Sequence, residues 1–148
     1  MAHGFRRTRG GVEVRFERVE AELLQQLARE VLATLDADPD HPALARVLPS
    51  ASQDDPVLAA EMRELMGDEL RATKRERLVL LAAEAAAGVV VLDEDGSERW
   101  LTALNDLRLA LGTVLDVTEE EPPEVDDAYA VYQWLGYLLE SLLEAVAD

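Results

Sequence analysis

The chain has 148 residues, a formal charge of −17 from 31 acidic and 14 basic residues, and no cysteine. This length is typical of one domain, which can form a core without disulfides or metal ions. The lack of cysteine excludes thiol nucleophiles and thiolate zinc ligands and favours a reducing, cytoplasmic setting. No apolar run approaches the roughly 20 residues of a membrane span, so we expect neither membrane insertion nor secretion.

The first predicted elements are a β-hairpin and a helix. Residues 1–16 contain two short alternating segments around Gly10-Gly11, and glycines supply the positive φ angles of a two-residue hairpin turn. Over residues 17–37, apolar side chains recur at spacings of three and four, which predicts an amphipathic helix. The Pro- and Asp-rich stretch up to Pro56 is predicted to be a surface loop, with a helical turn near residues 43–47.

Residues 56–87 are predicted to form a pair of helices. Asp54 or Asp55 can cap the first helix, and Pro56 suits its first turn. Gly67 is expected to separate the two, and the second ends in a run, residues 78–87, that is apolar on nearly every side and typical of a buried central helix. Residues 88–92 are short and β-branched, which favours a third strand against the hairpin.

The C-terminal half is predicted to contain two further helices. Residues 97–112 carry a regular apolar stripe, begin after a cap at Asp93 or Ser97, and end near a glycine. An acidic stretch with Pro122-Pro123 is expected to be a solvated linker to a last helix over residues 126–147. The predicted fold is therefore mainly α: five to six helices in one compact domain, residues 1–148, with a small N-terminal β-hairpin that a third short strand can join.

The sequence shows none of the common catalytic or cofactor patterns. It has no Gly-x-Ser-x-Gly elbow, no dinucleotide-binding glycine motif and no phosphate-binding loop. Asp36, Asp38, Asp40 and His41 approach the spacing of a calcium loop, but His41 stands where glycine is needed, and Val47 where the closing acid is needed. We therefore expect no enzyme activity, no cofactor and no metal.

The basic residues suggest a possible contact with nucleic acid, which the overall charge opposes. The hairpin and the middle of the chain would form a basic patch if they met, through Arg6, Arg7, Arg9, Arg71, Lys74 and Arg75. The competing interpretation is that Asp68, Glu69 and Glu76 of the same helix neutralise much of this charge locally. Since affinity for nucleic acid rests largely on neutralising phosphates, a charge of −17 disfavours such binding.

The last predicted helix is rich in aromatic residues. Four of the seven aromatics of the chain lie within nine residues, namely Tyr129, Tyr132, Trp134 and Tyr137. At 100° per residue, Trp134 and Tyr137 lie beside a thin polar stripe and away from the leucine line expected to face the core. This pattern favours an interface for self-association or for a partner, with a central core helix as the alternative.

The stretch Trp100-Leu-Thr-Ala-Leu-Asn-Asp-Leu-Arg-Leu-Ala-Leu-Gly112 resembles a small actinobacterial family of unknown function. Members of that family are commonly encoded beside the adaptor of the Clp protease, so the resemblance implies a single cytoplasmic domain near regulated proteolysis and names no reaction. Trp100, Asn105, Asp106 and Arg108 belong to the motif. Buried polar groups persist only with partners, so we expect the last three to pair within the structure.

Two functions are compatible with these features. The first is a non-enzymatic, adaptor-like regulatory domain that binds an unidentified protein and self-associates, as a homodimer, through its C-terminal aromatic helix. The alternative is a transcription-associated regulator that contacts DNA through its N-terminal arginines or mimics DNA with its acidic surface.

Overall fold

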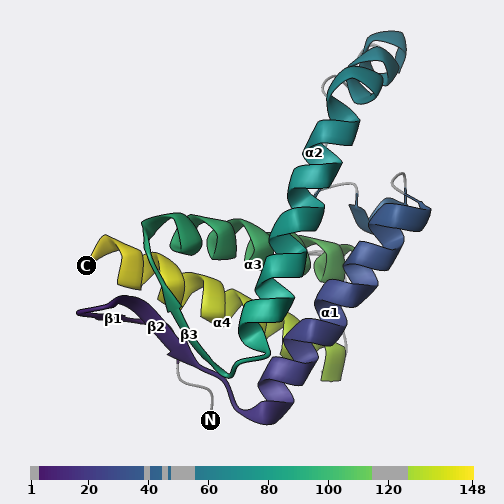
Figure 1. The fold of residues 1–148 in the computed structure, drawn as a ribbon. Helices are drawn as coiled ribbons and strands as arrows, with labels where there is room; N and C mark the ends of the chain where they lie inside the picture. The colour runs from purple at the N-terminus through teal and green to yellow at the C-terminus, as the bar shows by residue number, and fades with distance from the viewer. Residues whose placement is uncertain (1–3, 39–40, 45–46, 48–55, 115–126) are drawn as a thin grey trace.

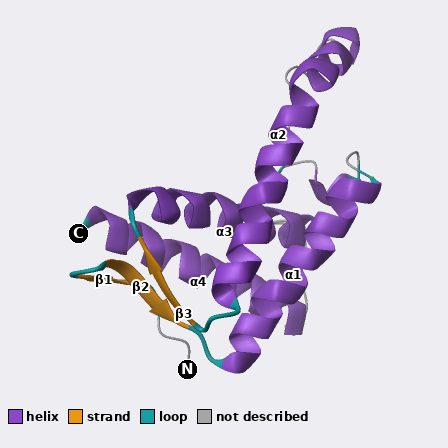
Figure 2. Cartoon of the chain, viewed as in Figure 1, coloured by secondary structure: helices purple, strands orange, loops and turns teal. Residues whose placement is uncertain are grey.

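The structure is a computed structural model that describes residues 4–38, 41–44, 47, 56–114 and 127–148 (Figure 1). Its described part contains four α-helices and a three-stranded sheet (Figure 2), so the prediction of a mainly α fold is confirmed, while the predicted count of five to six helices is wrong. In chain order the elements are β1 (Arg6–Thr8), β2 (Gly11–Arg15), α1 (Arg18–Ala37), the 3-10 turn η1 (Pro42–Leu44), α2 (Pro56–Ala85), β3 (Val89–Leu92), α3 (Glu94–Val114) and α4 (Asp127–Ala147).

The sheet has the order β1-β2-β3 and is antiparallel throughout, which confirms both the hairpin and the third strand. The turn lies one residue earlier than predicted: Arg9 and Gly10 form it, and Gly11 already pairs with Thr8 as the first residue of β2. One face of the sheet packs on the core through Val12, Val14, Val90 and Leu92. The other face is left to solvent, as alternation along a strand requires.

Gly11 is the position of the hairpin at which a residue with a side chain does not fit. Its φ of +130° is rare for L-residues, and an added Cβ would collide with the carbonyl oxygen of Leu92. We expect Gly11→Ala to lower the free energy of unfolding by about 1–3 kcal/mol. At Gly10 an added Cβ meets only Val91, at 3.8 Å, so Gly10→Ala is the control. Equal urea midpoints for the two variants would contradict this expectation.

α2 is one continuous helix, where the sequence predicted two. Gly67 lies inside it, because a single glycine costs a helix only about 1 kcal/mol and does not end it by itself. The helix ends at Ala85, and Gly88, with a φ of +81°, turns the chain towards β3. The N-terminal half of α2 extends away from the rest of the molecule, and its C-terminal half packs beside α1 and α3 (Figure 1).

The C-terminal half of α2 is not the buried central helix that its composition predicted. Leu78, Leu81 and Ala85 are buried, whereas Val79 and Leu80 are exposed. These positions follow the spacing of one helix face, so only the side towards α1 and α3 enters the core. Apolar residues on the outer side remain in contact with solvent.

α3 begins at Glu94, three residues before the predicted start, because Asp93 caps it. The Asp93 carboxylate accepts a hydrogen bond from the Gly96 backbone N–H at 2.7 Å, and the Ser97 hydroxyl donates to the Asp93 carbonyl oxygen. Of the two predicted caps, Asp93 and Ser97, the structure therefore has Asp93. The cap fixes the entry of α3 directly after β3, and Trp100, two turns further on, is fully buried.

Candidate functional site

A buried ion pair joins the motif helix to α2. Lys74 Nζ lies 3.0 Å from Asp106 Oδ1, and the two side chains are only 14% and 3% exposed. Burial raises the pKa of Asp106 above its ordinary value, and the charge of Lys74 offsets part of this effect. The second carboxylate oxygen, Oδ2, is buried and has no hydrogen-bond partner among the described residues. Asp106 thus pairs within the fold, as expected.

Arg108 lies between α3 and α4. Its guanidinium carbon is 4.9 Å from the ring centre of Tyr132, a cation–π distance. Gly136 lets the arginine approach α4, since an added Cβ there would lie 3.4 Å from Nε, and Gly112 leaves similar room for the Tyr132 ring. Nε is buried without a hydrogen-bond partner in the described part of the chain. Arg108 is therefore held by packing, and Asn105 beside these residues is half-buried.

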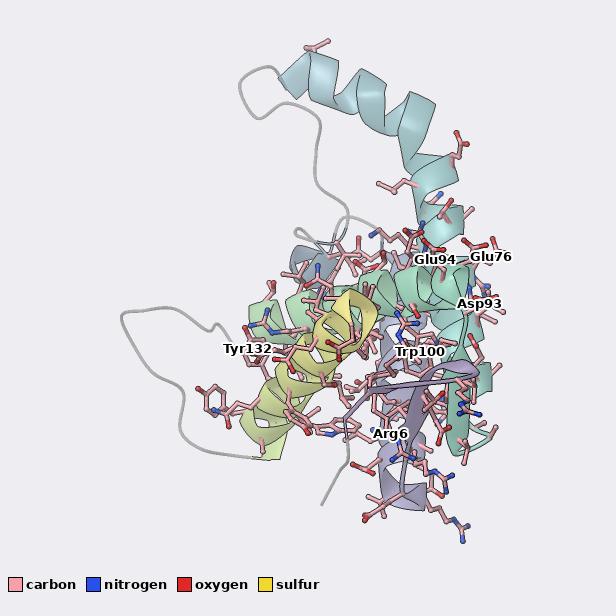
Figure 3. The ribbon with its side chains drawn as sticks, turned by 90° about the vertical axis from the view of Figure 1, so that its left-hand side faces the viewer. Arg6, Glu76, Asp93, Glu94, Trp100 and Tyr132 are labelled. Carbon is pink, nitrogen blue, oxygen red and sulfur yellow. The ribbon has the colours of Figure 1, made fainter. Side chains whose placement is uncertain are left out.

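Trp100 of α3, labelled in Figure 3, is the centre of an aromatic cluster that joins the hairpin to α3. Its ring stacks on Phe16 with centres 5.9 Å apart and meets the edge of Phe5 at 5.8 Å. The indole N–H points to Glu84 of α2 at 3.4 Å, and Arg99 binds the same carboxylate at 2.7 Å. This part of the motif therefore fixes the sheet, α2 and α3 relative to one another.

The four aromatics of α4 do not form one exposed surface. Trp134 packs against the core with its ring 6.4 Å from Phe16, so the prediction that it faces away from the core is wrong. Its indole N–H is buried and finds no acceptor among the described residues. Tyr129 and Tyr132 are half-buried and stack on each other at 6.3 Å. Tyr137 alone of the four is exposed.

The structure does not bring the six predicted basic residues together. Arg6, Arg7 and Arg9 lie at the free edge and turn of the sheet, and Figure 3 shows Arg6 well apart from Glu76, which neighbours Arg75 on α2. Arg75 makes a two-point ion pair with Asp36 of α1, and Lys74 pairs with Asp106 of α3. The predicted basic patch is therefore two separate groups, and Lys74 and Arg75 of the α2 group pair with acids of other helices.

On the sheet, acidic side chains partner the arginines. Arg15 lies 3.0 Å and Arg6 3.6 Å from Glu13, and the hydrogen bond from Arg15 is the main reason that the pKa of Glu13 is lowered. Arg7 donates to the carbonyl oxygen of Val146 at the end of α4. These contacts leave the hairpin with less free positive charge than its composition suggests.

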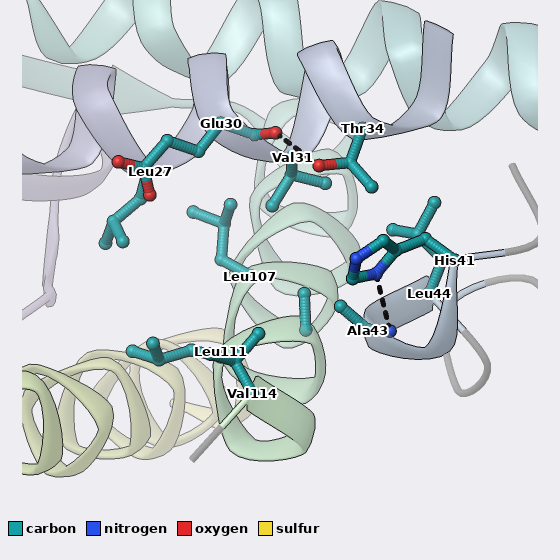
Figure 4. A pocket seen from close by; sticks show the side chains of 11 residues that line it. Leu27, Glu30, Val31, Thr34, His41, Ala43, Leu44, Leu107, Leu111 and Val114 are labelled. Atoms are coloured by element: carbon teal, nitrogen blue, oxygen red, sulfur yellow. Dashed lines mark hydrogen bonds between the residues drawn. The ribbon is translucent and has the colours of Figure 1, made fainter. Parts of the chain in front are cut away.

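A pocket of about 190 Å³ lies between α1, η1 and α3 (Figure 4). Its walls are mostly apolar, formed by residues such as Leu27, Val31, Leu107 and Leu111. His41 stands at one side, and its Nδ1 accepts a hydrogen bond from the Ala43 backbone N–H. The sequence carried no signal for this pocket, because its walls come from three separate segments whose apolar residues were assigned to core stripes.

The described residues hold no group of three or more side chains arranged to bind a metal ion. Asp36, a member of the candidate calcium loop, binds Arg75, and Asp40 lies outside the described residues. The acidic linker, residues 115–126, also lies outside them. None of the described helices combines the length and the apolar character needed to cross a membrane.

Comparison with known proteins places these features in a family. The family described as "Domain of unknown function (DUF2017)" matches residues 2–146. The chain is 33% identical over 129 residues to a protein of Mycobacterium leprae named putative oxidative stress regulator AosR, which covers 73% of this chain and 59% of that protein. It is 31% identical over 126 residues to the oxidative stress regulator AosR of Mycobacterium tuberculosis and of Mycobacterium bovis, which covers 71% of this chain and 58% of those proteins.

These matches confirm the expected resemblance to a family of unknown function with actinobacterial members. The chain spans less than three fifths of the length of these relatives. No solved structure matches the chain.

Proposed function

The chain belongs to the DUF2017 family, and from this premise we propose that it is a cytoplasmic regulatory domain that acts by binding another protein and not by catalysis. The relatives named oxidative stress regulators support the regulatory part of this proposal. Thiol oxidation is one common way to sense oxidants, but these 148 residues contain no cysteine. Thiol oxidation is therefore not open to this stretch of chain, and contacts with another macromolecule are the route that we propose.

The contacts that the motif residues make within the fold support a binding role for the domain over a catalytic one. Asp106, the one acid that is buried among the described residues, is paired with Lys74, and Arg108 is packed on Tyr132. A general acid or base needs access to a substrate, which Asp106 lacks at 3% exposure. The motif is therefore best understood as the part that fixes the helices in place.

The observation that carries the proposal is the outer stripe of α4. Gln133, Tyr137, Glu140, Leu143, Glu144 and Ala147 follow one exposed line of this helix. Tyr137 and Leu143 are 49% and 53% exposed, and the helix contains no lysine or arginine. A partner segment that combines apolar and basic side chains matches this stripe in both hydrophobicity and charge.

The alternative, a regulator that contacts DNA through its N-terminal arginines, has less support. Arg6, Arg7 and Arg15 each have a partner within the molecule, and the bases of α2 lie elsewhere. DNA binding would require these contacts to be exchanged for phosphates against a charge of −17. Tight retardation of duplex DNA at physiological salt would favour this alternative over the protein-binding proposal.

A pull-down from the lysate of a source cell tests the proposed surface. We expect the protein to retain a specific partner, and Tyr137→Ala combined with Leu143→Ala to reduce its recovery about tenfold, since interface anchors contribute about 2 kcal/mol. Val19→Ala, at an exposed apolar position of α1, is the control and is expected to change nothing. Recovery of the Clp adaptor would support the setting that the family resemblance implies. Equal recovery by all variants would rule out the α4 stripe.

A further inference from the structure

β3 is an edge strand whose outer side has no partner strand in the part of the chain that the structure describes. It pairs with β2 alone, with Val89 opposite Arg15 and Val91 opposite Glu13. β1 forms the other edge of the sheet. The sheet therefore ends in two strands that could accept another one.

The hydrogen-bond pattern shows which backbone groups of β3 face outwards. The Phe16 N–H donates to the Gly88 carbonyl oxygen at 2.7 Å, at the start of the β2–β3 ladder. In an antiparallel pair, residues alternate between bonding the neighbouring strand and pointing away from it. Val90 and Leu92 therefore bond β2, and the N–H and C=O groups of Val89 and Val91 point to the open edge. The described residues supply no backbone partner for the outward N–H and C=O groups of Val89 and Val91.

The side chains of the two edge strands differ in charge, and charge affects whether an edge can pair with another strand. β1 carries Arg6 and Arg7, and charged residues on an edge strand oppose contact with other strands. β3 has the sequence Val-Val-Val-Leu, with no charge, proline or bulge to protect it. Val89 and Val91 are 49% and 52% exposed, so no other element covers them. This strand has the features of an edge that is normally paired.

We propose that β3 pairs antiparallel with β3 of a second copy of the chain and so joins the two sheets into one of six strands. All outward backbone groups of Val89 and Val91 form hydrogen bonds only in the register in which each Val89 faces Val91 of the other copy, so we assign this register. The two-fold axis then passes between the two Val90 residues, and four hydrogen bonds form. The exposed valines of both copies come together on the outer face.

The charges that flank β3 fit this arrangement. On the outer face, Arg15 lies beside Val89 and Glu13 beside Val91. In the paired sheet, each row across the axis runs from Arg15 through two valines to Glu13 of the other copy. Like charges therefore do not face each other across the axis, although the copies repel overall. The self-association predicted from the sequence is thus assigned to β3 and not to Trp134, which packs, partly buried, against the core.

Sedimentation of the full chain at concentrations on the order of 100 μM tests the proposal. We expect a monomer–dimer equilibrium, and we expect Val91→Lys to raise the dimer dissociation constant at least about tenfold. Val19→Lys, on exposed α1, is the control with the same change of charge. Both variants add one positive charge and so reduce the repulsion between the acidic copies equally. If only Val91→Lys weakens the dimer, the cause must therefore be the edge of β3. A wild-type chain that stays monomeric, or two variants that behave alike, would overturn the proposal.

The register can be tested separately because the chain has no cysteine of its own. Facing residues of a hydrogen-bonded antiparallel pair have Cα atoms about 5.5 Å apart, within reach of a disulfide. We therefore expect a mixture of Val89→Cys and Val91→Cys chains to form covalent dimers on oxidation. Each variant alone should form far fewer, because identical positions lie more than about 7 Å apart in this register. Equal cross-linking in the mixture and in the single variants would overturn the proposed pairing.

Discussion

Replacing Lys74 with methionine should lower the free energy of unfolding by about 3–5 kcal/mol, because it leaves the Asp106 carboxylate buried without a counter-charge. The stem of methionine keeps most of the packing of the lysine, so the loss reports mainly on charge. Arg75→Met is the matched control. Arg75 also forms an ion pair between helices, with Asp36, but both side chains are about half exposed, so we expect a loss below about 1 kcal/mol. Similar losses for the two variants would contradict the special role of Lys74.

The effect of Lys74→Met should depend on pH in a defined direction. Burial holds the pKa of Asp106 above its ordinary value in the folded chain. A carboxyl raised in this way stabilises the fold below its unfolded pKa, and this contribution is lost as pH rises through the folded pKa. Without the ammonium of Lys74 the folded pKa should rise further.

The stability difference between the wild type and Lys74→Met should therefore shrink as pH falls and Asp106 takes up a proton. Urea titrations of both chains over a range of pH measure this difference. In the double variant Lys74→Met with Asp106→Asn, the pH dependence of stability that the Asp106 carboxyl causes should disappear. A difference that stays constant with pH would show that the carboxylate is not the cause.

Local signals in the sequence predicted much of the fold correctly. The alternation around Gly10, the β-branched run before Asp93 and the proline at the start of α2 each act within a few residues of the structure that they specify. The cap at Asp93 was one of two predicted options, and its hydrogen bond to Gly96 decides between them. Such elements need no knowledge of distant contacts.

The errors arise where packing between distant segments decides. Gly67 was expected to break a helix, but its small penalty does not outweigh the continuous helical segment on both sides. The apolar run at the end of α2 gave no sign of which side meets α1 and α3, so the exposure of Val79 could not be predicted. Helical periodicity shows which residues share a face and not which face is covered.

The candidate site shows the same limit. Trp134 does lie off the leucine line of α4, as its angle predicts, but Phe16 of the hairpin covers it from 118 positions earlier in the sequence. Lys74 was expected to pair with acids of its own helix, yet it pairs with Asp106, 32 positions away. The sequence correctly indicated that Asp106 needs a partner within the fold, and only the fold could identify it.

Trp100→Ala should lower the free energy of unfolding by about 3–5 kcal/mol, the usual cost of removing a large buried aromatic. The side chain is fully buried, and its stacking on Phe16 and edge contact with Phe5 would be lost together. A domain of this size is stable by only about 5–15 kcal/mol, so a large part of its stability would be removed. The Glu84 carboxylate would also lose its contact with the indole N–H, while Arg99 would still hold it.

Two companion variants separate the causes of this loss. Trp100→Phe keeps an aromatic ring and should cost less than Trp100→Ala, because stacking on Phe16 survives while the hydrogen bond to Glu84 is lost. Tyr137→Ala, at the exposed aromatic of α4, should cost less than about 1 kcal/mol. Urea denaturation followed by far-ultraviolet circular dichroism measures all three. If Trp100→Ala unfolds at the same urea concentration as Tyr137→Ala, the aromatic cluster does not hold the hairpin on α3, and the buried contacts of α1 with α2 and of α3 with α4 must carry the stability instead.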